Sequence, residues 1–245
     1  MSNNDKSSAV TTSAERAMIE KFLHPRMTTE HIWSGGGLCM ATRIHSMLPG
    51  KRFVGRALTA RTLAGFTRAG QEALAQAQPG EVLVIAAGGP GELSPWGGMV
   101  HWNATRNGLA GVVVDGPTRD LLEIKALENA IPLFACGQAP AIAGFGAPTT
   151  GAIRETVMCG GVPVSTGDLI YGDDDGVAVV PWVKVEQVLD LALKGIVFDD
   201  KEQAWVESGG TVFDLLTMLS GVDGSNYKER KFRWVAGPGI EPLKD

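Results

Sequence analysis

Arg119 and Asp120 carry the clearest potential for chemistry, since a guanidinium and a carboxylate stand side by side at the end of an apolar run. They close the segment VVVDGPTRD, residues 112–120, in which Gly116-Pro117 turns the chain. A guanidinium offers a planar fork that suits a carboxylate, and an aspartate ligates hard divalent cations directly or through water. The pair is therefore typical of a site that holds an anionic substrate beside a metal ion.

A second candidate segment is the glycine-rich stretch GGPGELSPWGGMV, residues 88–100. Gly97, Gly98 and Met99 stand where a helix is predicted to begin, and the free backbone N–H groups of a helix start bind anions. The stretch has neither the phosphate-loop pattern nor the dinucleotide-binding glycine spacing. We therefore expect it to hold a substrate carboxylate without the help of a lysine.

Both segments also have a structural explanation. Acidic residues favour helix N-termini because of the helix dipole, and Arg119 can serve as a surface ion-pair partner. A run of glycines can be no more than a tight turn. The spacing alone leaves these alternatives open.

The predicted elements would bring the two segments together. Alternation of small or apolar with polar residues predicts a strand over residues 53–63, and apolar runs predict strands over 81–86, 109–115 and 131–135. Helices are predicted between them, over residues 68–77, 98–107 and 118–129. This rhythm indicates parallel strands with helical crossovers, and ligands of such sheets lie at the carboxyl ends of the strands. We expect Thr118 to cap the third helix and Arg119 and Asp120 to lie in its first turn.

The rest of the chain flanks this α/β portion. A helix is predicted over residues 13–24, short strands over 162–164, 168–171 and 177–180, and helices over 184–193, 199–207 and 212–219. The predicted organisation is a disordered tail, residues 1–12, a single α/β domain, residues 13–221, and a C-terminal arm, residues 222–245.

Composition excludes several classes of function. A formal net charge of −5 and a charged fraction of 20% give no general footprint for nucleic acid or an anionic membrane. No stretch approaches the length of a membrane span, and the polar start lacks the apolar core of a secretory signal. Three isolated cysteines predict neither a disulfide framework nor a zinc site, so a cytoplasmic location is expected.

The two candidate segments together carry a family resemblance. The stretch ATRNGLAGVVVDGPTRD, residues 104–120, preceded by WGGM, resembles the RraA-like proteins and the 4-hydroxy-4-methyl-2-oxoglutarate / 4-carboxy-4-hydroxy-2-oxoadipate aldolases. Further matching stretches are FVGRALTA at 53–60, PGEVLV at 79–84, GGVPV at 160–164, and GD through DDDGV to Pro181 at 167–181. The resemblance covers roughly residues 30–210.

The resemblance implies a fold and a set of site residues. The implied fold is an α/β swivelling β/β/α-type sandwich core with a parallel βαβ portion and a helical C-terminal extension, assembled as trimers or hexamers with active sites at subunit interfaces. Asp120 would bind Mg²⁺ or Mn²⁺, Arg119 would bind pyruvate, and the backbone of Gly97, Gly98, Met99 and Val100 would hold the pyruvate carboxylate. Glu202, with Glu207 behind it, would complete the metal site of a neighbouring subunit.

The implied activity is that of a class II pyruvate aldolase, as used in aromatic degradation. It would cleave a 4-hydroxy-2-oxo diacid to pyruvate and a second oxo acid, with oxaloacetate decarboxylation as a side activity. The sequence departs from the family pattern at Pro90, where many members carry an acidic residue that Glu92 can replace. It departs again at His101, which can face the site and move a proton near neutral pH, or simply pack.

Two other functions remain open at this point. The first is a related lyase or decarboxylase that acts on another 2-oxo acid. The second is a non-catalytic regulator of the RraA type, which binds an RNA-degrading enzyme. The retained Arg119-Asp120 pair and the Gly97-Gly98 turn favour catalysis over a pure binding role.

Overall fold

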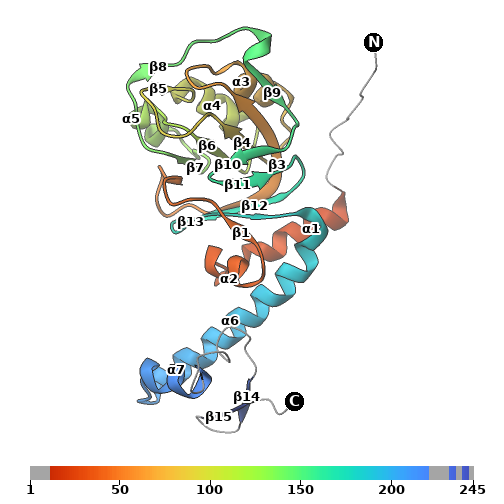
Figure 1. Cartoon of the computed structure of the whole chain (residues 1–245), viewed down its shortest axis with the longest axis vertical. Coiled ribbons are helices and arrows are strands. Elements are labelled where there is room, and N and C mark those ends of the chain that lie inside the picture. The colour runs from red at the N-terminus through yellow and green to blue at the C-terminus, as the bar shows by residue number, and fades with distance from the viewer. Residues whose placement is uncertain (1–11, 221–231, 236–238, 243–245) are drawn as a thin grey trace. The chain divides into compact units, whose positions relative to one another are not determined.

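In the computed structural model, a curled mixed sheet forms the centre of the first of two compact units, Met1–Ala192 and Leu193–Asp245 (Figure 1). The structure describes residues 12–220, 232–235 and 239–242. Most of the predicted tail, residues 1–12, and of the predicted arm, residues 222–245, lies outside these residues. The mixed α/β architecture with a long helix near the C-terminus confirms the predicted fold class.

The main sheet has the strand order β1-β13-β12-β3-β4-β6-β7-β2, with β9 paired to the end of β3. Two short pairs, β10 with β11 and β5 with β8, lie outside it. The strands of this unit are β1 Leu38–Cys39, β2 His45–Ser46, β3 Phe53–Thr62, β4 Glu81–Ala86, β5 Leu93–Ser94, β6 Gly111–Asp115, β7 Leu133–Ala135, β8 Ala141–Ile142, β9 Gly151–Ile153, β10 Val157–Cys159, β11 Val162–Val164, β12 Leu169–Asp173 and β13 Gly176–Val180.

The strands β3, β4, β6 and β7 run parallel, as predicted, and end at one edge of the sheet. Helices α3, Arg68–Gln76, α4, Gly98–Arg106, and α5, Leu121–Ala126, form the crossovers between them. The strand β4 reads EVLVIA, an almost continuous apolar run, because a parallel strand is covered on both faces. The loops that follow β4 and β6 therefore meet at the carboxyl edge of the sheet.

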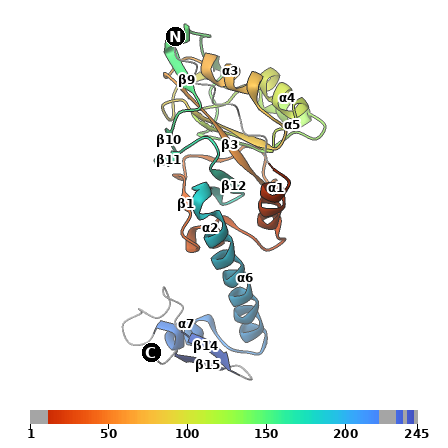
Figure 2. The same cartoon turned by 90° about the vertical axis from the view of Figure 1, so that its right-hand side faces the viewer.

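Alternate residues of the parallel strands feed two separate cores. Leu83 and Ile85 pack with α3, α4 and α5 on one face, whereas Val82 and Val84 pack with the β10–β11 hairpin on the other. Figure 2 shows this arrangement from the side, with the helices and the hairpin on opposite faces of the sheet. The two-faced burial fixes the register of β4 and β6, since a slip of one residue would exchange the two cores.

Several elements have bounds that the sequence did not predict. The structure adds α2, Thr29–Ser34, and the short strands β1, β2, β9 and β10, while the predicted helix at residues 13–24 divides into α1, Ser13–Glu20, and a 3₁₀ turn, Lys21–Leu23. The helix predicted over residues 118–129 is wrong in extent, because α5 begins only at Leu121. Arg119 and Asp120 therefore lie before the first residue of α5.

The second unit contains most of α6, Val185–Glu207, and all of α7, Val212–Ser220. The predicted break in α6 after residue 193 is absent: the helix is continuous, and Ile196 and Phe198 within that stretch are buried. The turn after α6 is closed by Trp205, whose indole N–H donates to the carbonyl of Thr211 at 3.0 Å. Residues 232–235 and 239–242 pair as β14 and β15. Within the described residues, every helix is too short or too polar to cross a membrane.

Candidate functional site

The loops after β4, β6 and β7 are tied together directly above the ends of these strands. Thr118 forms parallel bridges with Trp96 on one side and Gln138 on the other. Its backbone N–H donates to the carbonyl of Gly137 at 2.9 Å, and its hydroxyl donates to the carbonyl of Trp96 at 3.3 Å. Thr118 is fully buried, so it fixes the position of the next two residues instead of capping α5 as predicted.

Asp120 occupies the N-cap position of α5 in a left-handed conformation, with φ of 60° and ψ of 33°. Residues other than glycine adopt this conformation at a cost, and aspartate is among those that tolerate it best. Arg119, just before it, is held by a hydrogen bond from its N–H to the carbonyl of Trp96 at 3.0 Å. Both residues therefore lie in the turn before the helix, and not in its first turn.

The turn aims the Asp120 carboxylate at the start of α4. Its Oδ2 accepts a hydrogen bond from Nη1 of Arg119 at 2.6 Å and another from the backbone N–H of Gly98 at 3.1 Å. The two side chains are partly exposed, at 29% for Arg119 and 25% for Asp120. The structure thus brings the two predicted segments together around one carboxylate oxygen.

The glycines at the start of α4 are required by this contact. A Cβ at Gly97 would lie 2.8 Å from Oδ2 of Asp120 and 3.0 Å from Nε of Arg119. Gly97 is the N-cap, with extended backbone, and both glycines are buried. Met99 follows as a strongly exposed side chain and Val100 as a half-buried one. These four predicted residues form the helix start, with Arg119 lying alongside Gly97.

Glu123 is an acidic residue of this region that the sequence did not single out. A Cβ on Gly98 would lie 2.7 Å from its Oε2 and 3.2 Å from Cβ of Asp120. Glu123 and Asp120 are three residues apart, and that spacing places side chains on one side of a helix. In the sequence, only the i, i+3 spacing from Asp120 indicates Glu123 as a site residue, and this spacing is informative only if the start of α5 is known.

His101 is fully buried and has partners on both ring nitrogens. The indole of Trp96 can only donate, so Nδ1 of His101 accepts its N–H at 3.3 Å and Nε2 carries the proton toward the carbonyl of Ile131, 3.2 Å away. Burial lowers the pKa of His101 to about 4, against a smaller raising effect of the Ile131 carbonyl. His101 therefore packs against Trp96 with both ring nitrogens engaged, and its predicted role in the chemistry stays a prediction.

The other predicted residues belong to other elements. Glu202 lies on α6 within the second unit, so its contribution to a neighbour's site stays a prediction. Pro90 and Glu92 lie exposed in the loop between β4 and β5.

The donors near Asp120 fit a hard divalent cation. Mg²⁺ prefers oxygen ligands, and it commonly binds through one or two carboxylates while keeping several waters. Asp120 and Glu123 offer such carboxylates at the start of α5. Across the part of the chain that the structure describes, no group of three or more His, Cys, Asp or Glu residues is placed to hold a metal ion. A cation at Asp120 would therefore depend on water or on other chains for its remaining ligands.

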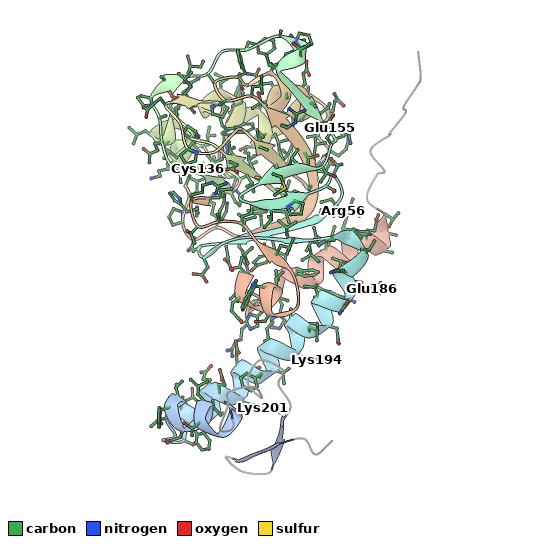
Figure 3. The ribbon with its side chains drawn as sticks, in the orientation of Figure 1. Arg56, Cys136, Glu155, Glu186, Lys194 and Lys201 are labelled. Atoms are coloured by element: carbon green, nitrogen blue, oxygen red, sulfur yellow. The ribbon has the colours of Figure 1, made fainter. Side chains whose placement is uncertain are left out.

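Asp115, at the end of β6, connects several of the loops beneath the site through its carboxylate. Its carboxylate accepts from Arg43, from the thiol of Cys136 at 3.3 Å and from the backbone N–H of Gly160 at 2.8 Å. Burial by itself raises the pKa of Asp115, but these hydrogen bonds and the charge of Arg43 outweigh it and hold the pKa below its usual value. Cys136, labelled in Figure 3, has its pKa raised to about 12 by burial and by Asp115, so its thiol stays protonated.

The fold is that of a mixed α/β protein in which Arg119 and the start of α4 contact the Asp120 carboxylate at the carboxyl edge of the sheet. Residues 32–179, more than half of the chain, match the family model described as RraA-like, Aldolase/RraA. The chain belongs to the RraA-like family.

Individual relatives agree with this assignment. A protein from Halalkalibacterium halodurans named "Putative 4-hydroxy-4-methyl-2-oxoglutarate aldolase" is 41% identical over 141 residues, which are 58% of this chain and 65% of that relative. The RNA-processing inhibitor RraA from Thermus thermophilis is 27% identical, with a TM-score of 0.53 over 71% of this chain and 93% of the other. A Pseudomonas syringae structure at 23% identity shares the fold, with a TM-score of 0.69 over 81% of this chain and 96% of the other.

Proposed function

We propose that this chain is a divalent-metal-dependent aldolase that cleaves a 4-hydroxy-2-oxo diacid to pyruvate and a second oxo acid. The observation that carries the proposal is the contact of Arg119 and the Gly98 N–H with a single carboxylate oxygen. A helix start and a guanidinium that share one carboxylate oxygen are groups suited to binding the carboxylate of a 2-oxo acid. The similarity to the Halalkalibacterium halodurans protein supports the same substrate class.

Substrate binding follows from the positions of the donors. The carboxylate of the 2-oxo acid would accept from Arg119 and from the backbone N–H groups of residues 97–100. These groups belong to the loops after β4 and β6, which the buried Thr118 bridges tie together. The donors are therefore fixed before the substrate arrives, which lowers the entropic cost of orienting it.

The reaction needs a proton to leave the C4 hydroxyl as the C3–C4 bond breaks. The bonding electrons become the enolate of pyruvate, which takes a proton at C3 to give the methyl group. Arg119 stabilises the negative charge as it forms, and Oε2 of Glu123 is a carboxylate oxygen available to accept the hydroxyl proton. A bound Mg²⁺ or Mn²⁺, held by Asp120, would supply further positive charge at the 2-oxo group. Loss of CO₂ from oxaloacetate leaves the same enolate, so that side activity is part of the proposal.

We also propose that the active protein is a homo-oligomer, a trimer or hexamer. Exposed apolar side chains lie on the two helices that begin at the site: Met99 and Trp102 on α4 are 70% and 51% exposed, and Leu122 on α5 is 87% exposed. Clustered apolar side chains on a surface favour burial against another protein chain. In such an assembly, Glu202 of a neighbouring chain is the candidate for an additional metal ligand.

The test is pyruvate release from 4-hydroxy-4-methyl-2-oxoglutarate with Mg²⁺ or Mn²⁺, followed through a coupled dehydrogenase. Arg119→Lys should lower kcat by roughly 100-fold or more because it loses the planar fork of donors that fits a carboxylate. Asp120→Asn should lower kcat by a similar factor because it removes the charge that the cation requires. Arg106→Lys, an exposed arginine on α4, is the matched control and should retain full turnover. Unchanged turnover in both site variants would refute the assignment.

Likeness to the Thermus inhibitor favours one alternative, a regulator that binds an RNA-degrading enzyme. The same exposed residues, Met99, Trp102 and Leu122, could serve that contact. The alternative requires no metal-dependent pyruvate release from any 4-hydroxy-2-oxo diacid together with tight binding of the RNA-degrading enzyme. Cleavage of oxaloacetate alone would instead indicate a related decarboxylase.

A further inference from the structure

One oxygen atom occupies both anion-binding groups of the proposed site. Oδ2 of Asp120 is 2.6 Å from Nη1 of Arg119 and 3.1 Å from the backbone nitrogen of Gly98. Both groups are among those to which the proposed function assigns the substrate carboxylate. Asp120 therefore satisfies, within the chain itself, the donors that an incoming 2-oxo acid needs.

From this contact we infer that the Asp120 carboxylate occupies the position of the substrate carboxylate in the metal-free protein. It competes with the substrate for Arg119 and the Gly98 N–H until it moves away. The inference rests on the proposed function, because it takes Arg119 and the start of α4 as the substrate's anion site. The negative charge of Asp120 repels a second carboxylate that approaches the same guanidinium and the same helix start. Tight binding of the 2-oxo acid thus favours the state in which the Asp120 carboxylate has left both donors.

The local backbone is shaped to hold this closed arrangement. Asp120 adopts a φ of 60°, which turns its side chain toward α4 instead of along its own helix. Gly97 and Gly98 lack the Cβ atoms that would lie 2.8 Å from Oδ2 and 3.2 Å from Cβ of Asp120. The fold therefore provides both the direction and the space for the internal carboxylate.

This arrangement orders the binding events. A divalent cation carries twice the charge of the Arg119 guanidinium that Asp120 contacts at 2.6 Å, so the cation should bind first, draw the carboxylate away and release Arg119 for the substrate. Glu123, beside Gly98, can assist in drawing the cation to this position. The substrate should consequently bind weakly to the metal-free protein and tightly only after the cation. A site in which Asp120 held no donor would show no such order.

The experiment measures oxalate binding by calorimetry to the full chain after metal removal on a chelating resin. Asp120→Gly keeps the left-handed backbone at no steric cost, and Asp120→Asn keeps the shape while removing the charge. Both variants should bind oxalate on the order of tenfold more tightly than the metal-free wild type. The control is Asp174→Asn, which removes the same charge from an exposed carboxylate that accepts the Gly50 N–H at 2.8 Å. It should bind oxalate as the wild type does.

The result is decided by the metal-free affinities alone. Tighter binding by both Asp120 variants, with Asp174→Asn unchanged, supports the inference. Equal binding by wild type and variants, weaker binding by the variants, or no binding by any of them overturns it. The proposed function is judged separately by metal-dependent pyruvate release from the wild type. An active wild type with equal metal-free affinities would refute the inference and leave the function standing.

Discussion

The guanidinium of Arg43 donates two parallel hydrogen bonds to the carboxylate of Asp115, from Nε to Oδ1 at 3.0 Å and from Nη2 to Oδ2 at 2.8 Å. Asp115 ends β6 and is 4% exposed, and its backbone carbonyl also accepts the N–H groups of Ala87 and Gly89. The pair therefore connects the loop before β2 to the loops that follow β4 and β6. In this way it stabilises the strand ends and loops that position the Thr118 bridges and the turn at Asp120.

Arg43→Ala should destabilise the protein by about 1–3 kcal/mol, because it leaves the buried Asp115 carboxylate without its charged partner. The folded pKa of Asp115 lies below its usual value of 3.8, so its stabilising effect is present above that value. The effect is lost as the pH falls through the lowered folded pKa, where the unfolded chain binds the extra proton. Urea unfolding at pH 7 and at stepwise lower pH should show the gap between variant and wild type closing below about pH 4.

The matched control for this prediction is Arg61→Ala. Arg61 pairs with Glu155, labelled in Figure 3, at 3.3 Å, but both side chains are about half exposed. Solvent screens such a pair, so its loss should cost under about 1 kcal/mol. Equal losses in the two variants would show that the Arg43–Asp115 pair is an ordinary surface ion pair.

Much of the framework could be predicted from local patterns, whereas the contacts that complete the site could not. The apolar runs in the sequence show where β4 and β6 end. Because both strands are parallel, the topology of the sheet predicts that the Gly97–Gly98 turn lies close to Arg119 and Asp120. The left-handed conformation of Asp120 could not be predicted in this way, because the residues after Pro117 are equally typical of the first turn of a helix. That conformation depends on the tertiary bridges of Thr118.

The partners of Asp115 show the same limit more strongly. Arg43, Cys136 and Gly160 come from three loops that are distant in sequence, and no local spacing links them to β6. His101 was open to either interpretation, since a helix position alone does not tell which side faces the core. Its burial against Trp96 depends on where the loop before α4 returns to the sheet.

Gly97→Ala should lower kcat/KM for the 2-oxo acid by roughly 10- to 100-fold. The new Cβ would lie 2.8 Å from Oδ2 of Asp120 and 3.0 Å from Nε of Arg119, so both side chains must move. Gly97 has an extended φ of −157°, which any residue adopts, so the effect would come from this contact and not from backbone strain. Steady-state kinetics of pyruvate release provide the measurement.

The control for the Gly97 variant is Gly91→Ala in the same loop. An added Cβ at Gly91 meets no atom within 4 Å, so this variant should keep the kinetics of the wild type. Unaltered kinetics in Gly97→Ala would mean that the Arg119–Asp120 pair does not need its present position for turnover.

Glu123→Gln tests the proposed route of the C4 hydroxyl proton. If Oε2 of Glu123 accepts that proton, the amide should lower kcat by roughly 100-fold or more at saturating Mg²⁺ or Mn²⁺. Glu128→Gln, an exposed acid shortly after α5, is the control and should be fully active. A fully active Glu123→Gln would place the proton acceptor elsewhere.

His101→Phe should remove a pH dependence of stability without abolishing turnover. Burial lowers the pKa of His101 from its usual 6.5 to about 4, so the folded protein keeps the ring neutral while the unfolded chain protonates it. The stabilising effect is complete above pH 6.5 and is lost progressively as the pH falls toward 4, by up to about 3 kcal/mol. Phenylalanine does not titrate, so urea unfolding of the variant should change less between pH 7 and pH 4.5 than that of the wild type. A loss of kcat comparable to that of Arg119→Lys, in a variant with intact fold, would instead return His101 to the chemistry.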